Sequence, residues 1–171
     1  MLIIICGLPG SGKSSFARTL SRELDAHLVS SDLVRKEMEA QGRYVFDDEL
    51  DVYEEMATEA GRAVRGGNDV VVEATFYRKE MRDMFSMLAR LLHQKDVFIR
   101  IVSREDLIRE RLGHPRPDSQ ADFSIYRQVK SQYQDLEGDH LVIESKRDNI
   151  ESMVRKGTDY VRSQQEENVN C

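Results

Sequence analysis

Two patterns of hydrophobic and polar positions alternate along this chain. Short apolar runs are typical of buried strands, and longer segments with apolar residues at helical spacing are typical of amphipathic helices. The apolar runs predict five strands, at 2–6, 26–30, 69–74, 97–102 and 140–143. Strands that alternate with helices in this way favour an α/β fold, with a parallel sheet covered by helices on both faces.

The segments between and after these runs predict the helices. Their apolar stripes cover residues 16–24, 32–40, 50–64, 81–92, 107–112, 121–136 and 150–161. At 171 residues and 19.8 kDa, the chain has enough residues for one hydrophobic core and too few for two cores and a linker. We therefore expect a single domain over residues 1–163, followed by a polar tail over residues 164–171.

Composition and charge restrict the class of protein. Apolar residues make up 40% and charged residues 33%, as in folded proteins with amphipathic helices. No stretch approaches membrane length and the N-terminus lacks a signal-peptide pattern, so we expect a cytoplasmic protein with no membrane partner. Cys6 and Cys171 form neither a disulfide framework nor a metal cluster and are expected to be free thiols.

The first predicted strand leads directly into a complete GxxxxGK[ST] motif. Backbone N–H groups of residues 10–13 would surround a β-phosphate, Lys13 would reach the β- and γ-phosphates, and the Ser14 hydroxyl would bind Mg²⁺. The alternative is a glycine turn that only joins a strand to a helix. The residues expected to surround the nucleotide are Gly7, Leu8, Pro9, Gly10, Ser11, Gly12, Lys13, Ser14 and Ser15.

Two charged residues follow the second predicted strand, where ligands of parallel sheets bind. Asp32 and Arg35 lie three positions apart on the first turn of a helix, so they share a face. Asp32 could accept the proton of a substrate hydroxyl while Arg35 binds an acceptor phosphate or carboxylate. Alternatively, Asp32 is a helix N-cap and the two residues form a surface ion pair.

A carboxylate follows three valines at the end of the third predicted strand. Glu73 could hold Mg²⁺ through a water molecule, as the acidic residue of such a strand does. Alternatively, it could accept hydrogen bonds from backbone amides of the phosphate loop. Asp32 and Glu73 could also exchange the roles of base and metal partner, and both assignments stay open.

Three arginines surround a turn-rich break at residues 113–117, namely Arg109, Arg111 and Arg116. Mobile arginines that close over a triphosphate can neutralise the charge that develops during phosphoryl transfer. We therefore expect a small helical lid here, with Arg111 and Arg116 as the catalytic candidates and Arg111 also on the nucleotide. Solvated arginines on an amphipathic helix are the alternative.

Four segments together resemble the kinase family that includes polynucleotide 5′-hydroxyl kinase, zeta toxin and chloramphenicol phosphotransferase, and in particular its predicted ATP-binding kinase branch. They are GLPGSGKSSFA, SSDLVRK, DVVVEATF, and DLIRERL with the following Arg116 and SQAD. The resemblance implies a three-layer P-loop NTPase fold with strand order 2-3-1-4-5, Asp32 as general base and Arg35 on the acceptor. It also implies that Arg111 and Arg116 are lid arginines. The chain has Glu73 where this family usually has Asp, and Pro115 and Pro117 flank Arg116.

The sequence thus predicts a monomeric or weakly dimeric kinase that uses ATP and Mg²⁺ to phosphorylate a hydroxyl group. The acceptor could be a small metabolite, an antibiotic or the 5′-hydroxyl end of a nucleic acid. A net charge of −6 disfavours nucleic acid. An ATPase or nucleotide-dependent switch without a soluble acceptor is the alternative, because the same loop serves both classes.

Overall fold

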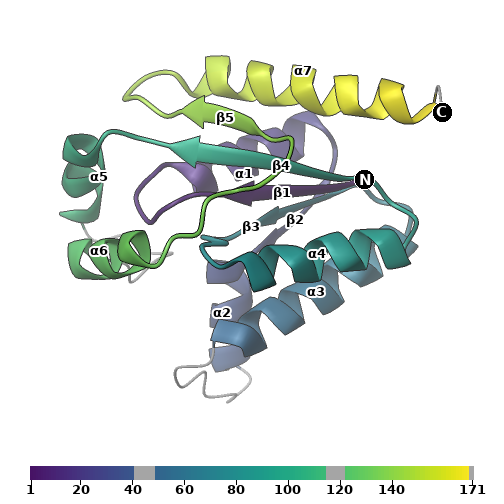
Figure 1. The fold of residues 1–171 in the computed structure, drawn as a ribbon, viewed down its shortest axis with the longest axis horizontal. Helices are drawn as coiled ribbons and strands as arrows, with labels where there is room; N and C mark the ends of the chain where they lie inside the picture. Colours follow the sequence, from purple (N-terminus) through teal and green to yellow (C-terminus); the bar gives the residue numbers. More distant parts are fainter. Residues whose placement is uncertain (41–48, 115–121, 170–171) are drawn as a thin grey trace.

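A computed structural model of the chain describes residues 1–40, 49–114 and 122–169. Its five strands form one parallel sheet in the order β2-β3-β1-β4-β5 (Figure 1). They are β1 (Leu2–Cys6), β2 (His27–Ser30), β3 (Val70–Glu73), β4 (Asp96–Val102) and β5 (Leu141–Glu144). The predicted α/β fold and the strand order implied by the family resemblance are both confirmed.

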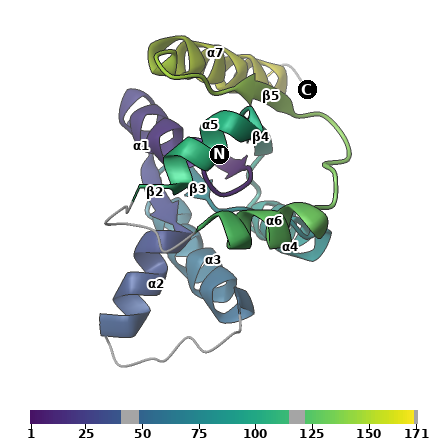
Figure 2. The ribbon, with the colours of Figure 1, turned by 90° about the vertical axis from the view of Figure 1, so that its left-hand side faces the viewer.

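The helices form a layer on each face of the sheet and a small group at its end. They are α1 (Lys13–Glu23), α2 (Ser31–Ala40), α3 (Glu49–Arg65), α4 (Lys79–Leu91), α5 (Glu105–Leu112), α6 (Phe123–Ser131) and α7 (Ile150–Val169). α1 and α7 cover one face, and α3 and α4 cover the other (Figure 1). α5 and α6 lie beyond the carboxyl ends of the strands (Figure 2).

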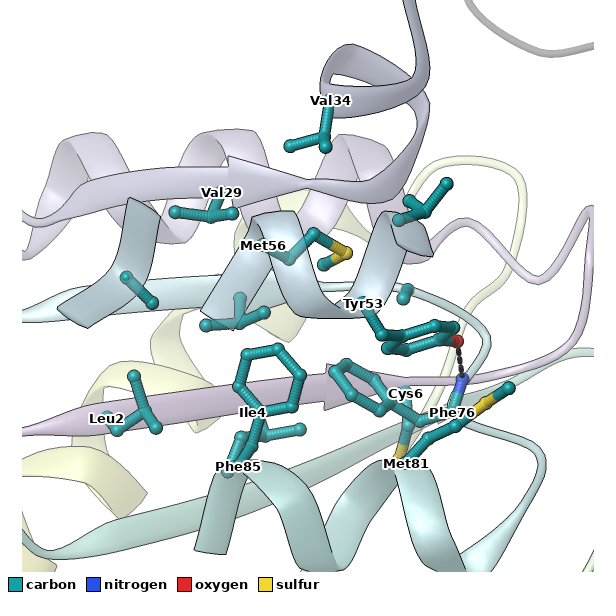
Figure 3. Close-up of a cluster of buried hydrophobic side chains, with 14 of the residues drawn as sticks. Leu2, Ile4, Cys6, Val29, Val34, Tyr53, Met56, Phe76, Met81 and Phe85 are labelled. Carbon is teal, nitrogen blue, oxygen red and sulfur yellow. Dashed lines mark hydrogen bonds between the residues drawn. The ribbon is translucent and has the colours of Figure 1, made fainter. Parts of the chain in front are cut away.

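The central strand β1 explains the two-sided core. Successive side chains of a strand point to opposite faces, so Leu2, Ile4 and Cys6 pack with α3 and α4. Ile3 and Ile5 pack with α1 and α7. All five residues of β1 are fully buried, as expected for the middle strand of a parallel sheet. Figure 3 shows Leu2, Ile4 and Cys6 in one of the two core clusters.

An aromatic contact fixes the segment that follows β3. Tyr53 and Phe76 pack edge to face, with ring centroids 5.2 Å apart. The Tyr53 hydroxyl also accepts a hydrogen bond from the Phe76 backbone N–H at 3.1 Å (Figure 3). The β3–α4 connection is therefore held against α3 beside the end of β1, where the Gly7 N–H donates to the Thr75 carbonyl at 3.3 Å.

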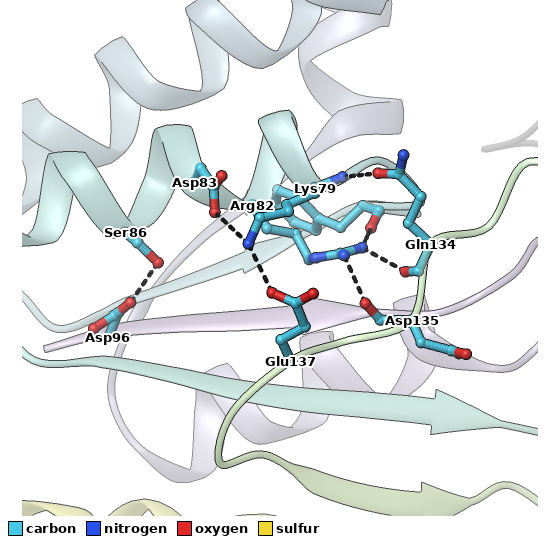
Figure 4. Close-up of polar contacts among 9 residues, drawn as sticks. Lys79, Arg82, Asp83, Ser86, Asp96, Gln134, Asp135 and Glu137 are labelled. Atoms are coloured by element: carbon cyan, nitrogen blue, oxygen red, sulfur yellow. Dashed lines mark hydrogen bonds and ion pairs between the residues drawn. The ribbon is translucent and has the colours of Figure 1, made fainter.

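The predicted helix over residues 121–136 is wrong at its C-terminal end, because α6 stops at Ser131. Tyr133 and Leu136 lie beyond the helix and pack against the core that α3 and α4 form with the sheet. The buried Arg82 guanidinium donates hydrogen bonds to the carbonyl oxygens of Gln134 and Asp135, both at 3.0 Å (Figure 4). These carbonyls bond to a side chain on α4, so the segment runs alongside α4 instead of continuing as helix.

The polar tail expected from residue 164 is helical as far as Val169, because α7 continues through it. The Lys95 ammonium donates to the Gln164 carbonyl at 2.9 Å, and the Gln165 side-chain amide reaches Asp69 at 3.4 Å. Gln and Glu are good helix formers, so the polar composition did not end the helix. Among the described residues, neither α7 nor any other helix is long and apolar enough to cross a membrane.

Candidate active site

The phosphate loop joins the end of β1 to the start of α1. Gly12 precedes α1 with φ of 97°, in the left-handed region that favours glycine. A Cβ atom at this position would lie 2.6 Å from the Ser145 hydroxyl oxygen, so a side chain would also force Ser145 to move. No side chain of the described residues caps the first N–H groups of α1. These donors and the positive end of the helix dipole can therefore bind an anion.

Glu73 organises a polar cluster beside this loop. Its side chain is 2% exposed, and Lys13 Nζ lies 3.5 Å from its Oε1 atom. Ser14 donates a hydrogen bond to Oε1 at 3.2 Å, and Ser30 donates one to Oε2 at 2.8 Å. The groups meet because Glu73 is in register with Ile5 on one side and Ser30 on the other. A buried carboxylate needs such partners to remain charged.

The oxygens of this cluster suit Mg²⁺. Magnesium is usually bound by one or two protein oxygens together with substrate phosphates and water. Ser14 and Glu73 place a hydroxyl and a carboxylate next to each other at the loop. The described residues contain no group of three or more His, Cys, Asp or Glu side chains that could hold a metal ion alone. The Glu73 carboxylate contacts the side chains of Lys13, Ser14 and Ser30, and its role beside Mg²⁺ stays a prediction.

Asp32 and Arg35 lie on the first turn of α2, immediately after β2. Both side chains are half-buried. Asp32 follows Ser30 by two residues, and Ser30 bonds to Glu73. α2 and the phosphate loop therefore both begin at the carboxyl ends of the strands. The Asp32 carboxylate is therefore placed on the β2 side of the site, and its role as a base stays a prediction.

Arg111 joins the phosphate loop to the segment after β5. Its Nη1 atom donates to the carbonyl oxygens of Gly10 at 3.2 Å and Ser11 at 3.1 Å. Its Nη2 atom donates to the Ser145 hydroxyl at 3.1 Å and the Lys146 carbonyl at 3.0 Å. From the sequence we predicted that Arg111 lies near the nucleotide, but we did not predict a role for Ser145 or Lys146. Their position directly after a strand was the available signal, because ligands bind at the carboxyl ends of parallel strands.

The other two predicted lid arginines differ in what can be said of them. The Arg109 guanidinium lies over the Phe123 ring, 4.0 Å from its centroid, and 3.8 Å from the Glu105 carboxylate. Arg109 thus joins α5 to α6 and, in this conformation, is not directed at the phosphate loop. Arg116 lies outside the described residues, together with the two flanking prolines.

A cavity of about 590 Å³ lies beside the Arg111 bridge. It is lined by α5 and by the segment after β5, specifically by Arg104, Asp106, Leu107, Glu110, Glu144, Ser145, Lys146 and Arg147. Its volume is in the range of small-molecule sites. The phosphate loop and a cavity of suitable size for a nucleoside therefore lie on either side of one arginine.

Comparison with known proteins gives one family match and several distant relatives. A family model described as "AAA domain" matches residues 2–137. Uncharacterised proteins of Mycobacterium tuberculosis and Mycobacterium bovis are 26% identical over an alignment of 123 residues that covers 65% of this chain and 25% of each relative. The chain thus spans about a quarter of the length of these curated relatives.

Solved structures show the same fold at low sequence identity. Kti12 of Chaetomium thermophilum, in complex with ADP-AlF3, has a TM-score of 0.75 at 20% identity and covers 95% of this chain and 98% of its own. The APS kinase CysC of Mycobacterium tuberculosis, with AMPPNP and APS, has a TM-score of 0.72 at 18% identity, with 94% and 96% covered. A gluconokinase of Sinorhizobium meliloti has 0.63 at 19%, with 90% and 86% covered. The fold is therefore that of P-loop kinases.

Proposed function

The chain belongs to the AAA domain family, and we propose that it is an ATP-dependent kinase that transfers the γ-phosphoryl group to an acceptor hydroxyl. The observation that carries the proposal is the arrangement around Glu73. Lys13 and Ser14 meet this carboxylate on the loop side, and Asp32 lies in the first turn of α2, beyond the carboxyl ends of the same strands. Such a site has a donor half and an acceptor half, which phosphoryl transfer between two substrates requires.

On the donor side, the phosphates of ATP would contact the loop amides and Lys13. Ser14 would bind Mg²⁺ directly and Glu73 through water, and the ion would neutralise charge on the β- and γ-phosphates. The nucleoside would occupy the cavity beside Ser145 and Lys146. Arg111, which contacts both loops, would approach the phosphates, and we expect Arg116 to assist it.

On the acceptor side, we assign different roles to the two carboxylates on the basis of the contacts of Glu73. Both oxygens of Glu73 already accept from serine hydroxyls, and Lys13 pairs with one of them. Those contacts suit a residue that supports the metal. Asp32 is half-buried at the start of α2, so it can take a proton from a hydroxyl. Arg35, three residues later, would bind an anionic group of the acceptor.

The acceptor is proposed to be a small molecule, which could be a metabolite or an antibiotic. The net charge of −6 opposes binding to a polyanion, although a nucleic acid 5′-hydroxyl end stays a candidate. Two of the similar structures are named for small-molecule kinases, an APS kinase and a gluconokinase. The branch related to polynucleotide 5′-hydroxyl kinase, zeta toxin and chloramphenicol phosphotransferase is proposed on the sequence resemblance.

A nucleotide-dependent ATPase or switch is the second candidate. The likeness to Kti12 fits this candidate, because the ligand of that structure, ADP-AlF3, is a nucleotide complex without an acceptor molecule. A protein that only hydrolyses ATP has no need for an acceptor-binding arginine beside a base. Asp32 and Arg35 therefore distinguish the two candidates.

The test is a screen with γ-labelled ATP against nucleosides, sugars, antibiotics and oligonucleotides with 5′-hydroxyl ends. We expect label on one acceptor class, and loss of all nucleotide-dependent activity in Lys13→Ala. Asp32→Ala should retain ATP binding and slow transfer by roughly a hundredfold or more, because it removes the general base.

Asp83→Ala is the matched control, since Asp83 is an exposed aspartate on α4. It should leave transfer unchanged. Steady ATP hydrolysis with no labelled acceptor would favour the switch, and an unchanged transfer rate in Asp32→Ala would refute its role as base.

A further inference from the structure

The outer side of α3 and α4 combines exposed apolar side chains with charges that are separated along the helices. The two helices cover one face of the sheet, and no described helix or strand lies outside them (Figures 1 and 2). Each helix leads into the start of a strand of the same parallel sheet, so α3 and α4 run in the same direction.

α4 carries the apolar part of this surface. Glu80, Met84, Met87 and Leu91 are four, three and four positions apart, so they form one stripe along the helix. Met87 is 55% exposed and Leu91 is 70% exposed, which are the two highest values among the large apolar side chains of the described residues. Two such side chains lie one turn apart on the same stripe, so their burial against a partner would favour association.

α3 carries a second stripe with the same spacing, formed by Glu54, Thr58, Gly61 and Arg65. Position 61 faces α4, because a Cβ atom placed there would lie 3.7 Å from Leu88 Cδ1. The same atom would lie 3.5 Å from Arg65 Nη1, so the Arg65 guanidinium lies beside Gly61 on this side of the helix. The stripe on α3 thus runs alongside the stripe on α4, and together they form a surface that we call the α3/α4 face.

Negative and positive charges lie at opposite ends of the α3/α4 face. The exposed carboxylates of Glu54 and Glu80 are in the N-terminal halves of the two helices, and the exposed guanidinium groups of Arg65 and Arg90 are in the last turns. Lys79 is also near the N-terminal end of α4, but its ammonium contacts carboxylates on α4 and on the segment after α6 (Figure 4). The face therefore has an acidic end and a basic end.

A second copy of this chain complements such a face. A two-fold axis that lies in the interface and crosses the helices at right angles places each helix on its own counterpart in the opposite direction. Glu54 of one copy then lies opposite Arg65 of the other, and the acidic end of α4 lies opposite the basic end. An axis parallel to the helices would place like charges together, so the charges select the antiparallel arrangement.

We propose that the α3/α4 face is the interface of a homodimer with this antiparallel arrangement. Met87 and Leu91 are buried between the copies, and the charge pairs lie around them. Two helices of this length side by side bury roughly 500 Å² per copy, which is less than most stable interfaces, so the dissociation constant is expected to be micromolar. The phosphate loops lie at opposite ends of this dimer, because the N-terminal ends of α3 and α4 point to the carboxyl ends of the strands.

Sedimentation equilibrium without nucleotide tests the interface, so its result does not depend on the proposed kinase activity. We expect the unmodified chain to change from monomer to dimer over roughly 1–200 µM. Glu54→Arg and Arg65→Glu should each raise the dissociation constant roughly tenfold or more, because each places like charges together at two symmetry-related contacts. Leu91→Gln should also weaken the dimer, because it replaces a buried apolar side chain with a polar one.

An equimolar mixture of Glu54→Arg and Arg65→Glu tests which residues face each other. In a mixed dimer both contacts again pair an arginine with a glutamate, so the mixture should regain the dimer that each variant loses alone. This recovery requires both variants to be folded, so it also separates a lost contact from a misfolded chain.

Glu151→Arg is the matched control, since it makes the same change in net charge at an exposed position of α7, on the other face of the sheet. It should leave dimer formation unchanged. The proposal is overturned if the unmodified chain stays monomeric over this range, which would leave the face to a different partner. It is also overturned if Glu54→Arg and Arg65→Glu form dimers as readily as the control, or if their mixture stays monomeric.

Discussion

At the scale of single residues, Gly12 sets the shape of the phosphate loop. Gly12→Ala adds a Cβ atom 2.6 Å from the Ser145 hydroxyl and 3.2 Å from Arg111 Nη1. The bridge between the two loops must move, so we expect ADP affinity to fall at least tenfold, measured by calorimetry; a change of that size equals about 1.4 kcal/mol.

Gly67→Ala separates this contact from backbone strain. Gly67 has φ of 88°, close to that of Gly12, and a Cβ atom there would meet nothing within 4 Å. The control should lose about 1–2 kcal/mol of stability from the left-handed backbone and keep its ADP affinity. Equal ADP affinity in Gly12→Ala and the unmodified chain would contradict the importance of the contact.

Sequence could predict the residues around the phosphate loop and could not predict all of their partners. The loop motif determines its own backbone, and the carboxyl-end rule brings Glu73 to it, so the contact of Lys13 with Glu73 follows from local pattern. Ser30 depends on the register of β2 against β3, which no local pattern fixes. The hydrogen bond from Arg111 to Ser145 depends on how α5 packs against the segment after β5, and a local sequence pattern does not predict that packing.

At the scale of secondary-structure elements, the contact of α1 with α7 is close enough to require glycine. A Cβ atom on Gly157 would lie 2.7 Å from Phe16 Cζ, and Phe16 is fully buried. Gly157→Ala should therefore lower the free energy of unfolding by about 1–3 kcal/mol, measured by urea denaturation, because the helices must separate or the ring must leave its rotamer.

The matched control is Gly61→Ala on α3. Gly61 is also inside a helix, but its nearest contacts would be ordinary, at 3.5 Å from Arg65 and 3.7 Å from Leu88. Alanine restricts the unfolded chain and favours helix, so this variant should be about 0.5–1 kcal/mol more stable or unchanged. A Gly157→Ala chain as stable as the control would show that α1 and α7 adjust at no cost.

The elements also show where apolar periodicity predicts well and where it fails. All five strands were predicted, because each is an apolar run between turn signals. The end of α6 was not, because Tyr133 and Leu136 continue the apolar spacing after the helix has ended. The carbonyls of the segment after it bond to the buried Arg82 on α4, and a hydrogen bond to a distant side chain leaves no signal in the spacing.

At the scale of the whole molecule, the buried Cys6 thiol couples stability to alkaline pH. The thiol donates to the Ile99 carbonyl at 3.5 Å, and burial raises its pKa from 9.0 to about 11. Above pH 9 the unfolded chain loses this proton while the folded chain keeps it. Unfolding is therefore increasingly favoured as pH rises from 9 towards 11.

Comparison with Cys6→Ala tests this effect, because the variant lacks the thiol and keeps the other titrating groups, among them Tyr133, whose pKa is raised by burial and also by the Cys6 thiol. We expect the free energy of unfolding of the unmodified chain to fall relative to the variant by up to about 1.4 kcal/mol per pH unit above pH 9. Urea denaturation at pH 8, 9, 10 and 10.5 measures it. Parallel curves for the two chains would mean that Cys6 ionises equally in both states.

The bridge made by Arg111 has a consequence for modularity. Arg111 lies within the segment that the family model matches, residues 2–137, but two of its partners, Ser145 and Lys146, lie outside it. The same outer segment supplies β5 and α7, which complete one edge and one face of the sheet. Residues 2–137, which match the family model, therefore lack part of the contacts and of the sheet that surround the phosphate loop. A chimera that transplants this segment between relatives would have to carry residues 138–169 with it to keep the nucleotide side intact.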